Sequence, residues 1–395
     1  MVNKLEKKKI LFVFHSEEKK SGATRSMLQI VTYLQQTGKY EIEAVFPKPN
    51  GTAAAYLETI GIKSHHYTYG RLMQNLSQPL LKRMIKFPFM CIRMIKMKSS
   101  VRKAAKELKN KGFDIVYSNT SSIVFGGFLG KKLGCKQAWH IREFRKLDHN
   151  IGFFLGEKYL LRHINRCSDA VFYVSKSVMD YHTNIIDPDK SYVTYSSYSP
   201  EFICPKDQFN FGKTLHVLIA GDVKPSKGQF DCVKAIKIAM DRQKDADFEL
   251  HIAGCPTTVG NYYQKMLDYI SENNLNAKVH LYGQVQDMFS LRKKMDVGIV
   301  ASTNEAFGRT TIEGMLSMMA MIGRNTGGTT EQFKDNQTGL LYDGTPDELA
   351  DKLLFYYDNR ERMQEMAVNG FNECVELYTH DNAAKIVDGI LDKIY

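Results

Sequence analysis

Short apolar segments alternate with longer segments of mixed apolar and polar positions along most of the 395-residue chain. The short segments are rich in β-branched residues, which predicts buried strands of a parallel sheet, and the longer segments have the composition of helices. A first series of predicted strands lies at residues 10–14, 42–46, 115–118, 137–141, 170–174 and 192–195. A second series lies at residues 215–220, 249–253, 279–282 and 297–300.

A break separates the two series. Residues 196–213 contain Pro200, Pro205 and Gly212 among several polar residues, which indicates a linker. Two series of alternating strands and helices on either side of a linker predict an α/β protein with two Rossmann-like domains that face each other across a cleft. The predicted parts are an N-terminal domain, a C-terminal domain and a terminal helical segment, at residues 1–200, 201–378 and 379–395.

Composition indicates a globular protein, because 43% of the residues are hydrophobic and 25% are charged. No apolar run approaches the ~18 to 20 residues that span a membrane. The charged start at residues 1–9 carries no small-residue cleavage site, so we expect no signal peptide and a cytoplasmic protein. Seven scattered cysteines without a Cys-x-x-Cys spacing argue against a disulfide framework and against a zinc site.

The formal net charge is +11, and its distribution is uneven. No Asp or Glu occurs from Thr59 to Lys106, and within residues 80–103 basic residues interleave with large apolar ones. This mixture predicts an amphipathic element that lies on an anionic membrane surface, and the alternative is a core helix with a solvated basic face. No nucleic-acid-binding motif accompanies the charge, so nucleic acid is not an expected partner.

The run Asn304-Glu305-Ala306-Phe307-Gly308-Arg309-Thr310-Thr311-Ile312-Glu313 lies between a predicted strand and a predicted helix at residues 311–319. In an open α/β sheet, ligands bind beyond the carboxyl ends of strands, where helix N-termini point unpaired N–H groups outward. Gly308 allows the backbone to approach a diphosphate, and Glu305 and Glu313 can each accept hydrogen bonds from two sugar hydroxyls. Taken singly, Glu305 could end a solvated loop and Glu313 could be a first-turn carboxylate.

The Glu-x7-Glu pair, its Phe-Gly dipeptide and the later runs at 327–331 and 336–341 resemble the donor half of retaining glycosyltransferases of family 4. The resemblance covers roughly the last 180 residues and is far more specific than a single glycine-rich loop. It implies the GT-B fold, with the C-terminal helix crossing back to the N-terminal domain. It also implies that Glu305 contacts the transferred sugar, that the amides of Phe307 and Gly308 contact its phosphate, and that Glu313 holds the ribose. Arg309 belongs to the same donor site.

Two further turns of the second domain resemble the family pattern. Where the family has Gly-Arg and then Lys-Gly to neutralise the leaving nucleotide, this chain keeps Lys227 but has Asp222 in place of the arginine. Lys224 or Arg309 could supply the missing charge. The turn at residues 282–285 resembles the base-binding turn, in which backbone atoms read the nucleobase, so the resemblance places Gly283 and Val285 in the donor site.

The first domain is expected to hold the acceptor. Its loop at residues 15–26 resembles the glycine loop of the family, with Gly22-Ala23 where many members have two glycines, and Arg25 follows in the same loop. It is not a Gly-x-Gly-x-x-Gly motif, which disfavours a dinucleotide oxidoreductase. The family also has a histidine near the reacting sugar at the end of the strand that His140 closes here. The resemblance therefore implies a catalytic role for His140 beside Glu305, whereas a lone histidine is otherwise more often structural.

Two Asp-x-Asp sequences, at residues 187–189 and 245–247, have the composition of turns and not of metal ligands. We therefore expect no metal and no cofactor. The predicted activity is retaining hexosyl transfer from a nucleoside-diphosphate sugar to a glycan or lipid-linked acceptor, at the inner face of the plasma membrane, in polysaccharide or glycolipid assembly. The alternatives are a non-hydrolysing sugar-nucleotide epimerase of GT-B fold, a catalytically inactive nucleotide-sugar-binding partner subunit and a membrane-associated binding protein.

Overall fold

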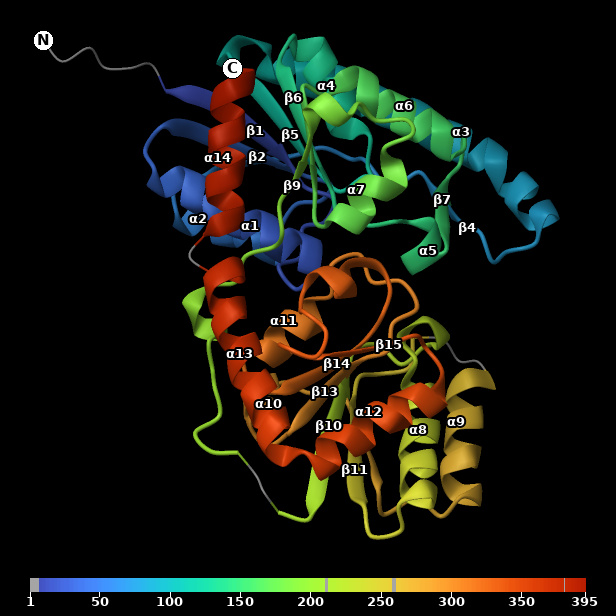
Figure 1. The fold of residues 1–395 in the computed structure, drawn as a ribbon. Helices are drawn as coiled ribbons and strands as arrows, with labels where there is room; N and C mark the ends of the chain where they lie inside the picture. Colours follow the sequence, from blue (N-terminus) through green and yellow to red (C-terminus); the bar gives the residue numbers. More distant parts are fainter. Residues whose placement is uncertain (1–6, 210–211, 258–260, 380) are drawn as a thin grey trace, which may run out of the picture. The chain divides into compact units, whose positions relative to one another are not determined.

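The computed structural model describes residues 7–209, 212–257, 261–379 and 381–395. These residues form two compact units, each with its own parallel sheet (Figure 1). Unit 1 runs up to Tyr198 and also includes Asp381–Tyr395, whereas unit 2 is Ser199–His380. Three parts of the predictions lie outside the described residues: the first six residues of the charged start, residues 210–211 of the linker and His380 in the last turn.

The sheet of unit 1 has seven strands in the order β3-β2-β1-β5-β6-β8-β9, and all its neighbours are parallel. The order reverses between β1 and β5, as in Rossmann folds. The strands are β1 (Lys8–Val13), β2 (Tyr40–Phe46), β3 (Lys63–His66), β5 (Ile115–Asn119), β6 (Lys136–Ile141), β8 (Ala170–Tyr173) and β9 (Ser191–Val193). A separate antiparallel pair joins β4 (Met73–Asn75) to β7 (Ile151–Phe153).

Helices connect these strands because parallel neighbours need crossovers. They are α1 (Gly22–Gln36), α2 (Thr52–Thr59), α3 (Leu80–Leu108), α4 (Phe125–Leu133), α5 (Lys146–His149), α6 (Glu157–Cys167) and α7 (Lys176–His182), with short 3-10 turns η1 (Lys109–Lys111) and η2 (Pro188–Lys190). The wholly buried strands, such as β5 and β8, explain the continuous apolar runs in the sequence.

The last helix, α14 (Asn382–Ile394), belongs to unit 1 and lies beside α1 (Figure 1). Its apolar face, which includes Ala384, Val387 and Leu391, is buried in the same core as Phe12 of β1 and Met27 of α1. This packing confirms the prediction that the C-terminal helix returns to the first domain.

The sheet of unit 2 has six strands in the order β12-β11-β10-β13-β14-β15, again all parallel and reversed in the middle. The strands are β10 (Thr214–Ala220), β11 (Asp247–Ala253), β12 (Val279–Gly283), β13 (Val297–Val300), β14 (Ala320–Arg324) and β15 (Leu340–Tyr342). The helices are α8 (Gln229–Arg242), α9 (Asn261–Glu272), α10 (Met288–Lys293), α11 (Arg309–Met315), α12 (Pro346–Asp358) and α13 (Arg360–Tyr378). The 3-10 turns are η3 (Pro200–Phe202), η4 (Pro225–Lys227) and η5 (Gly327–Glu331).

One predicted helix is shorter than its composition suggested. The predicted range 311–319 continues an apolar, methionine-rich run, but α11 ends at Met315, and Met318 has a φ of 56°. The chain then enters β14, which was not among the predicted strands. β15 is only three residues long, and β3 is polar, so neither produced a strand signal.

Helix α3 is the longest in the part of the chain that the structure describes, with 29 residues. No helix among the described residues is both long enough and apolar enough to cross a membrane.

Candidate functional site

The sheet of unit 2 changes strand order between β10 and β13, which is where ligands bind in open α/β sheets. The loops that follow these two strands lie against each other. The backbone N–H of Thr303 donates to the carbonyl oxygen of Ser226 at 3.0 Å. This contact joins the lysine-containing turn after β10 to the glutamate-containing turn after β13.

Lys227 and Glu305 meet at this junction. Lys227 Nζ donates to Glu305 Oε2 at 2.7 Å, and the two side chains are 27% and 16% exposed. Partial exposure leaves both groups accessible to a ligand, while the pairing holds them in one orientation. Lys227 and Glu305 are 78 positions apart in the sequence, and both were predicted to belong to the donor site. The structure brings them into contact.

Two glycines allow the backbone to pack closely at this site. Gly228 has a φ of 73°, and a Cβ there would lie 2.6 Å from the carbonyl oxygen of Ala301 at the end of β13. Gly308 has a φ of 82°, and a Cβ there would lie 2.7 Å from Gln332 Oε1. A larger residue at Gly228 would separate the two loops, and one at Gly308 would clash with Gln332, which gives a physical reason for the Lys-Gly and Phe-Gly dipeptides.

The turn at Gly308 also contains buried polar atoms. Gln332 Nε2 donates to the carbonyl oxygen of Gly308 at 3.0 Å, and Gly328 N–H donates to that of Glu305 at 2.7 Å. Within the described residues, the buried Gln332 Oε1 and Thr311 Oγ1 have no hydrogen-bond partner. Buried polar atoms are usually satisfied by protein, water or ligand, so these two atoms fit a site for a polar ligand.

Glu313 is fixed by arginines. It forms an ion pair with the buried Arg292 of α10, and its Oε1 lies 3.8 Å from Arg309 Nη2. The sequence analysis missed Arg292, because no spacing links it to the Glu-x7-Glu motif. The pairing gives Glu313 a structural contact in addition to the ribose contact that was predicted for it.

The remaining donor residues lie at other turns of unit 2. The Phe307 ring is buried and packs edge-on against Tyr378, with centroids 5.8 Å apart, so the turn can offer its backbone amide but not its ring. Gly283 ends β12 with a φ of 61°, and the half-buried Val285 follows it. Both lie at the carboxyl edge of the sheet, as a base-binding turn requires.

Asp222 is exposed in the turn after β10, where the family pattern has an arginine. Its carbonyl oxygen accepts from Gln229 Nε2 at 3.0 Å, so the turn is held by its backbone. Lys224 directly precedes η4, and Arg309 approaches Glu313, as described above. Compensation for Asp222 by Lys224 or Arg309 stays a prediction.

The two Asp-x-Asp sequences lie at the amino ends of strands. Asp187 Oδ1 accepts from Asp189 N–H at 3.0 Å in a turn before β9. Asp247 begins β11, where it pairs with Lys278 at 2.5 Å and accepts from Thr214 at 2.7 Å. The sequence at residues 187–189 therefore lies in unit 1. The sequence at residues 245–247 lies in unit 2, at the opposite edge of the sheet from the Lys227–Glu305 pair.

His140 ends β6 of unit 1 and is 1% exposed. Its Nδ1 lies 3.0 Å from Tyr117 Oη and 3.2 Å from Arg142 Nη2, and its Nε2 lies 3.4 Å from Thr194 Oγ1. Burial, followed by the nearby Arg142, lowers the pKa of His140 well below its usual value, so the ring is neutral. It borders a cavity of about 10 Å³, the space of about one water, so its contact with a sugar stays a prediction.

The predicted glycine loop of unit 1 is a loop followed by a helix. Gly22, Ala23 and Arg25 all lie in the first turn of α1. Asn119 Nδ2 donates to the carbonyl oxygen of Ala23 at 3.1 Å and lies 3.5 Å from His15 Nδ1. β1 and β5, which these loops follow, are the strands at which the order of this sheet reverses, so the predicted acceptor loop lies at the ligand-binding position of unit 1.

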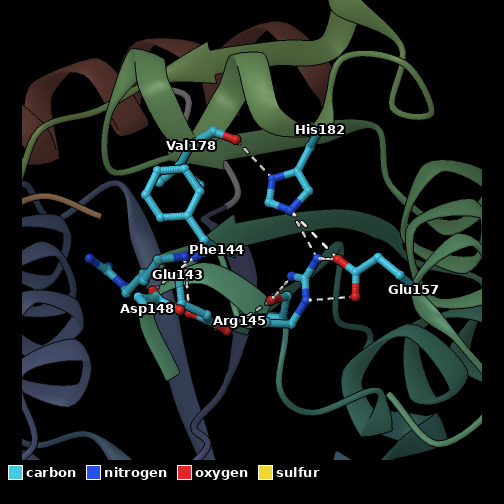
Figure 2. Close-up of polar contacts among 9 residues, drawn as sticks. Glu143, Phe144, Arg145, Asp148, Glu157, Val178 and His182 are labelled. Carbon is cyan, nitrogen blue, oxygen red and sulfur yellow. Dashed lines mark hydrogen bonds and ion pairs between the residues drawn. The ribbon is translucent and has the colours of Figure 1, made fainter. Parts of the chain in front are cut away.

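A second polar cluster follows β6 and was not predicted (Figure 2). Arg145 is fully buried, forms an ion pair with Glu157, donates to Ser121 Oγ, and has its Nη2 2.9 Å from His182 Nε2. Its φ of 67° and ψ of −64° form a γ-turn, closed by a 2.9 Å hydrogen bond from Lys146 N–H to the carbonyl oxygen of Phe144. This strained backbone persists because the surrounding contacts hold the arginine in place.

Comparison with known proteins identifies the C-terminal unit. Residues 205–373 match the family model described as glycosyl transferases group 1. Over this region the chain is similar to the group 1 glycosyl transferases. The match contains the Lys227–Glu305 pair, both glutamates of the Glu-x7-Glu motif and Arg292, and it confirms the resemblance that the motifs carried.

Curated relatives agree with this assignment. The D-inositol 3-phosphate glycosyltransferase of Paenarthrobacter aurescens is 28% identical over 156 residues, which cover 39% of this chain and 38% of the relative. The putative glycosyltransferase YtcC of Bacillus subtilis is 23% identical over 314 residues, which cover 73% of this chain and 75% of the relative. The chain spans less than half the length of the first curated relatives that it matches.

Solved structures establish the fold. HepE of Anabaena, solved in a complex with UDP, has a TM-score of 0.77 at 18% identity, with 98% of this chain and all of that chain covered. A glycosyltransferase of Rickettsia africae has a TM-score of 0.78 at 18% identity, with 98% of this chain and 99% of that chain covered. The chain therefore has the GT-B fold, with two Rossmann-like units.

Proposed function

We propose that this chain transfers a hexose from a nucleoside-diphosphate sugar to a hydroxyl acceptor, with retention of the anomeric configuration. The observation that carries the proposal is the Lys227–Glu305 pair at the point where the sheet order of unit 2 reverses. A cation and a carboxylate 2.7 Å apart match a ligand that has an anionic diphosphate next to a sugar. The UDP in the HepE structure supports a nucleotide as that ligand.

Each group has a separate task in this proposal. Lys227 contacts the diphosphate, where a charge-assisted contact contributes about 1.5 to 3 kcal/mol. Glu305 orients the sugar hydroxyls and stabilises the positive charge that develops as the glycosidic bond breaks. Glu313, fixed by Arg292, accepts hydrogen bonds from the ribose.

The transfer step follows from this arrangement. The bond between the anomeric carbon and the phosphate oxygen breaks, and the acceptor hydroxyl attacks from the face that the nucleotide leaves. The departing phosphate oxygen takes the proton of the attacking hydroxyl, so no separate base is needed. Lys227 and the Phe307–Gly308 turn neutralise the leaving diphosphate, which makes the proposed transfer independent of a metal at the reaction centre.

We also propose that the protein is cytoplasmic and binds the inner face of the plasma membrane through helix α3. Its acceptor would be a glycan or a lipid-linked molecule, in polysaccharide or glycolipid assembly. The buried stripe of α3 is Met90, Met94, Met97, Val101, Ala104 and Leu108. Other large apolar side chains of α3 are exposed instead: Leu80, Leu81, Met84, Ile85, Phe87, Phe89, Ile92 and Ile95, by 41% to 70%. The first turns of α3 extend beyond α4 and α6 in Figure 1.

Charge complementarity favours anionic lipid as the partner of this exposed stripe. Lys82, Arg83, Lys86 and Arg93 flank the apolar residues, and the helix carries no acidic residue before Glu107. Each basic residue near an anionic surface contributes about 1 kcal/mol to binding, and the apolar side chains add burial in the lipid.

The membrane proposal is tested by vesicle flotation with acidic phospholipid. Replacing Lys82, Arg83, Lys86 and Arg93 by Gln should release the protein from these vesicles and leave its unfolding temperature nearly unchanged. A charge-matched control replaces four exposed lysines of unit 2 by Gln, namely Lys244, Lys265, Lys293 and Lys294. Equal binding of the two variants would contradict the membrane role of α3.

The enzymatic proposal is tested in two steps. A thermal-shift panel of nucleoside diphosphates and nucleotide sugars first identifies the donor, and Lys227→Ala should weaken binding of the nucleoside diphosphate about 10- to 100-fold. Incubation of that donor with glycan and lipid-linked acceptors should then yield a new glycoside. An epimerised nucleotide sugar would instead show an epimerase, and donor binding without any product would show an inactive binding subunit.

A further inference from the structure

Unit 2 carries a cluster of histidines away from the donor site. His216 of β10, Glu249 and His251 of β11, and His280 of β12 project from one face of three neighbouring strands. The opposite face carries the alternate residues of the same strands, such as Val217 and Leu250, and forms the hydrophobic core. The cluster is half-buried, with side-chain exposures of 28%, 27%, 7% and 37% in the order given.

The side-chain atoms of this cluster converge. His216 Nδ1 lies 3.2 Å from His251 Nε2 and 3.7 Å from Glu249 Oε2. Glu249 Oε2 lies 3.9 Å from His251 Nε2 and 3.0 Å from His280 Nε2. One carboxylate oxygen therefore faces three ring nitrogens, each from a different histidine.

Tyr282 fixes the orientation of the most buried ring. His251 Nδ1 lies 2.9 Å from Tyr282 Oη. In the tautomer in which Nδ1–H donates to this oxygen, Nε2 keeps its lone pair toward Glu249 and His216. Histidines that bind metals typically have their other nitrogen held in this way by an outer partner.

We propose that His216, Glu249 and His251 bind a divalent transition-metal ion of the Zn²⁺ type, with His280 as an outer partner that contacts Glu249. Zinc prefers four nitrogen, sulfur or oxygen ligands at about 2.0 to 2.2 Å in a tetrahedral arrangement, which separates neighbouring ligand atoms by roughly 3.4 Å. The separations among the three protein ligand atoms are 3.2, 3.7 and 3.9 Å, close to that value, and water would take the fourth position. The cysteine pattern gave no signal for this site, because all three ligands are histidine or glutamate.

The site would connect β10 and β11, which carry its three ligands. These strands and β12 lead at their carboxyl ends into the turns of Asp222, Gly254 and Gly283. β12 is the edge strand, which pairs on one side only with β11. A bound metal would hold Glu249 in place, and Glu249 in turn contacts His280 of this edge strand, so the metal would act structurally and the proposal is independent of the transfer reaction.

The test is a titration of the full, untagged chain with Co²⁺, a spectroscopic substitute for Zn²⁺. We expect one equivalent to bind with the intense visible absorption of a tetrahedral site, and Zn²⁺ to displace it and raise the unfolding temperature. His216→Gln combined with His251→Gln should abolish the absorption. Tyr282→Phe, which removes only the outer partner, should weaken affinity about 10- to 100-fold.

His149→Gln serves as the control, because His149 is exposed and lies in unit 1. It should leave Co²⁺ binding unchanged. Absence of a stoichiometric Co²⁺ spectrum in the unaltered chain would overturn the proposal and leave a hydrogen-bonded histidine cluster. Retention of the spectrum in the double variant would place the metal elsewhere and overturn it equally.

Discussion

The two sheets end in carboxyl edges of opposite character, although both have the Rossmann strand order. In unit 2 the edge carries partly exposed ions on glycine turns, with Lys227 and Glu305 accessible from outside. In unit 1 the edge carries buried imidazoles and guanidinium groups, with His140 and Arg145 at 1% and 0% exposure. The first edge is arranged to meet a charged ligand, and the second to hold loops in one conformation.

Burial explains this difference in physical terms. A buried ionised group is costly unless it is paired, so Arg145 has contacts on every side that the structure describes. A buried imidazole is instead kept neutral, as His140 is. The edge of unit 1 therefore couples its stability to protonation, whereas the charges of the unit 2 edge stay partly exposed.

The largest expected effect is an acid sensitivity that is greater in unit 1 than in unit 2. Burial lowers the pKa of His15 and of His182 to about 3, and that of His140 well below its usual value. Between pH 6.5 and about 3 the unfolded chain binds protons that the folded chain excludes, so stability falls as the pH falls. Each histidine contributes up to about 1.4 kcal/mol per pH unit, or about 4 kcal/mol per pH unit for the three.

Hydrogen exchange at pH 7 and pH 5 measures this difference region by region. Peptides of β5, β6 and α7 should lose more protection at pH 5 than those of β10 and β13. Among the shifted histidines described, unit 2 has only His251, which makes it the internal control. Equal losses in the two units would contradict the comparison.

The second effect concerns the arginine of the γ-turn. Arg145→Met keeps the length of the side chain but leaves Glu157 without its buried partner, and removal of one member of such a pair costs several kcal/mol. Because Glu157 is 33% exposed, we expect about 3 kcal/mol of lost unfolding free energy in urea. Arg102→Met, at an exposed position of α3, should change stability by less than about 0.5 kcal/mol.

The third effect concerns the proposed catalytic role of Glu305 at the edge of unit 2. Glu305→Gln should lower kcat by roughly 10²-fold, the scale of one electrostatic group, with little change in nucleoside-diphosphate affinity. Steady-state kinetics with the identified donor and acceptor measure both quantities. Glu361→Gln, at an exposed position that begins α13, should leave kcat unchanged. Normal turnover in the Glu305 variant would mean that this motif is structural.

The sequence predicted the edge of unit 2 better than that of unit 1. The unit 2 edge depends on residues whose types are unusual at their positions, such as Gly228 and Gly308, where only a glycine fits the backbone. A backbone position that only glycine fits can be recognised from the sequence immediately around it. Contacts such as Glu313–Arg292 join residues 21 positions apart on different helices, and no local spacing records them.

The same reasoning explains the strands that were found and missed. Buried strands such as β5 and β13 produced apolar runs, and each was predicted within one or two residues. The polar edge strand β3 and the three-residue β15 lack that signal. Arg145 was invisible because a buried arginine is defined by its partners in space, and Glu157 and His182 come from two other helices.

The smallest expected effect separates the two roles of Glu313. A ribose contact contributes about equally in the ground and transition states, so Glu313→Gln should raise the donor KM by about tenfold or less, with kcat little changed. Because the same substitution also weakens the pair with the buried Arg292, it should lower the unfolding temperature as well. Arg292→Met should also lower the unfolding temperature. It should raise the donor KM only because the Glu313 carboxylate would lose the partner that fixes its position. If Glu313→Gln changed KM without any change in unfolding temperature, the arginine contact would be incidental, and Glu313 would then be a ligand-binding charge only.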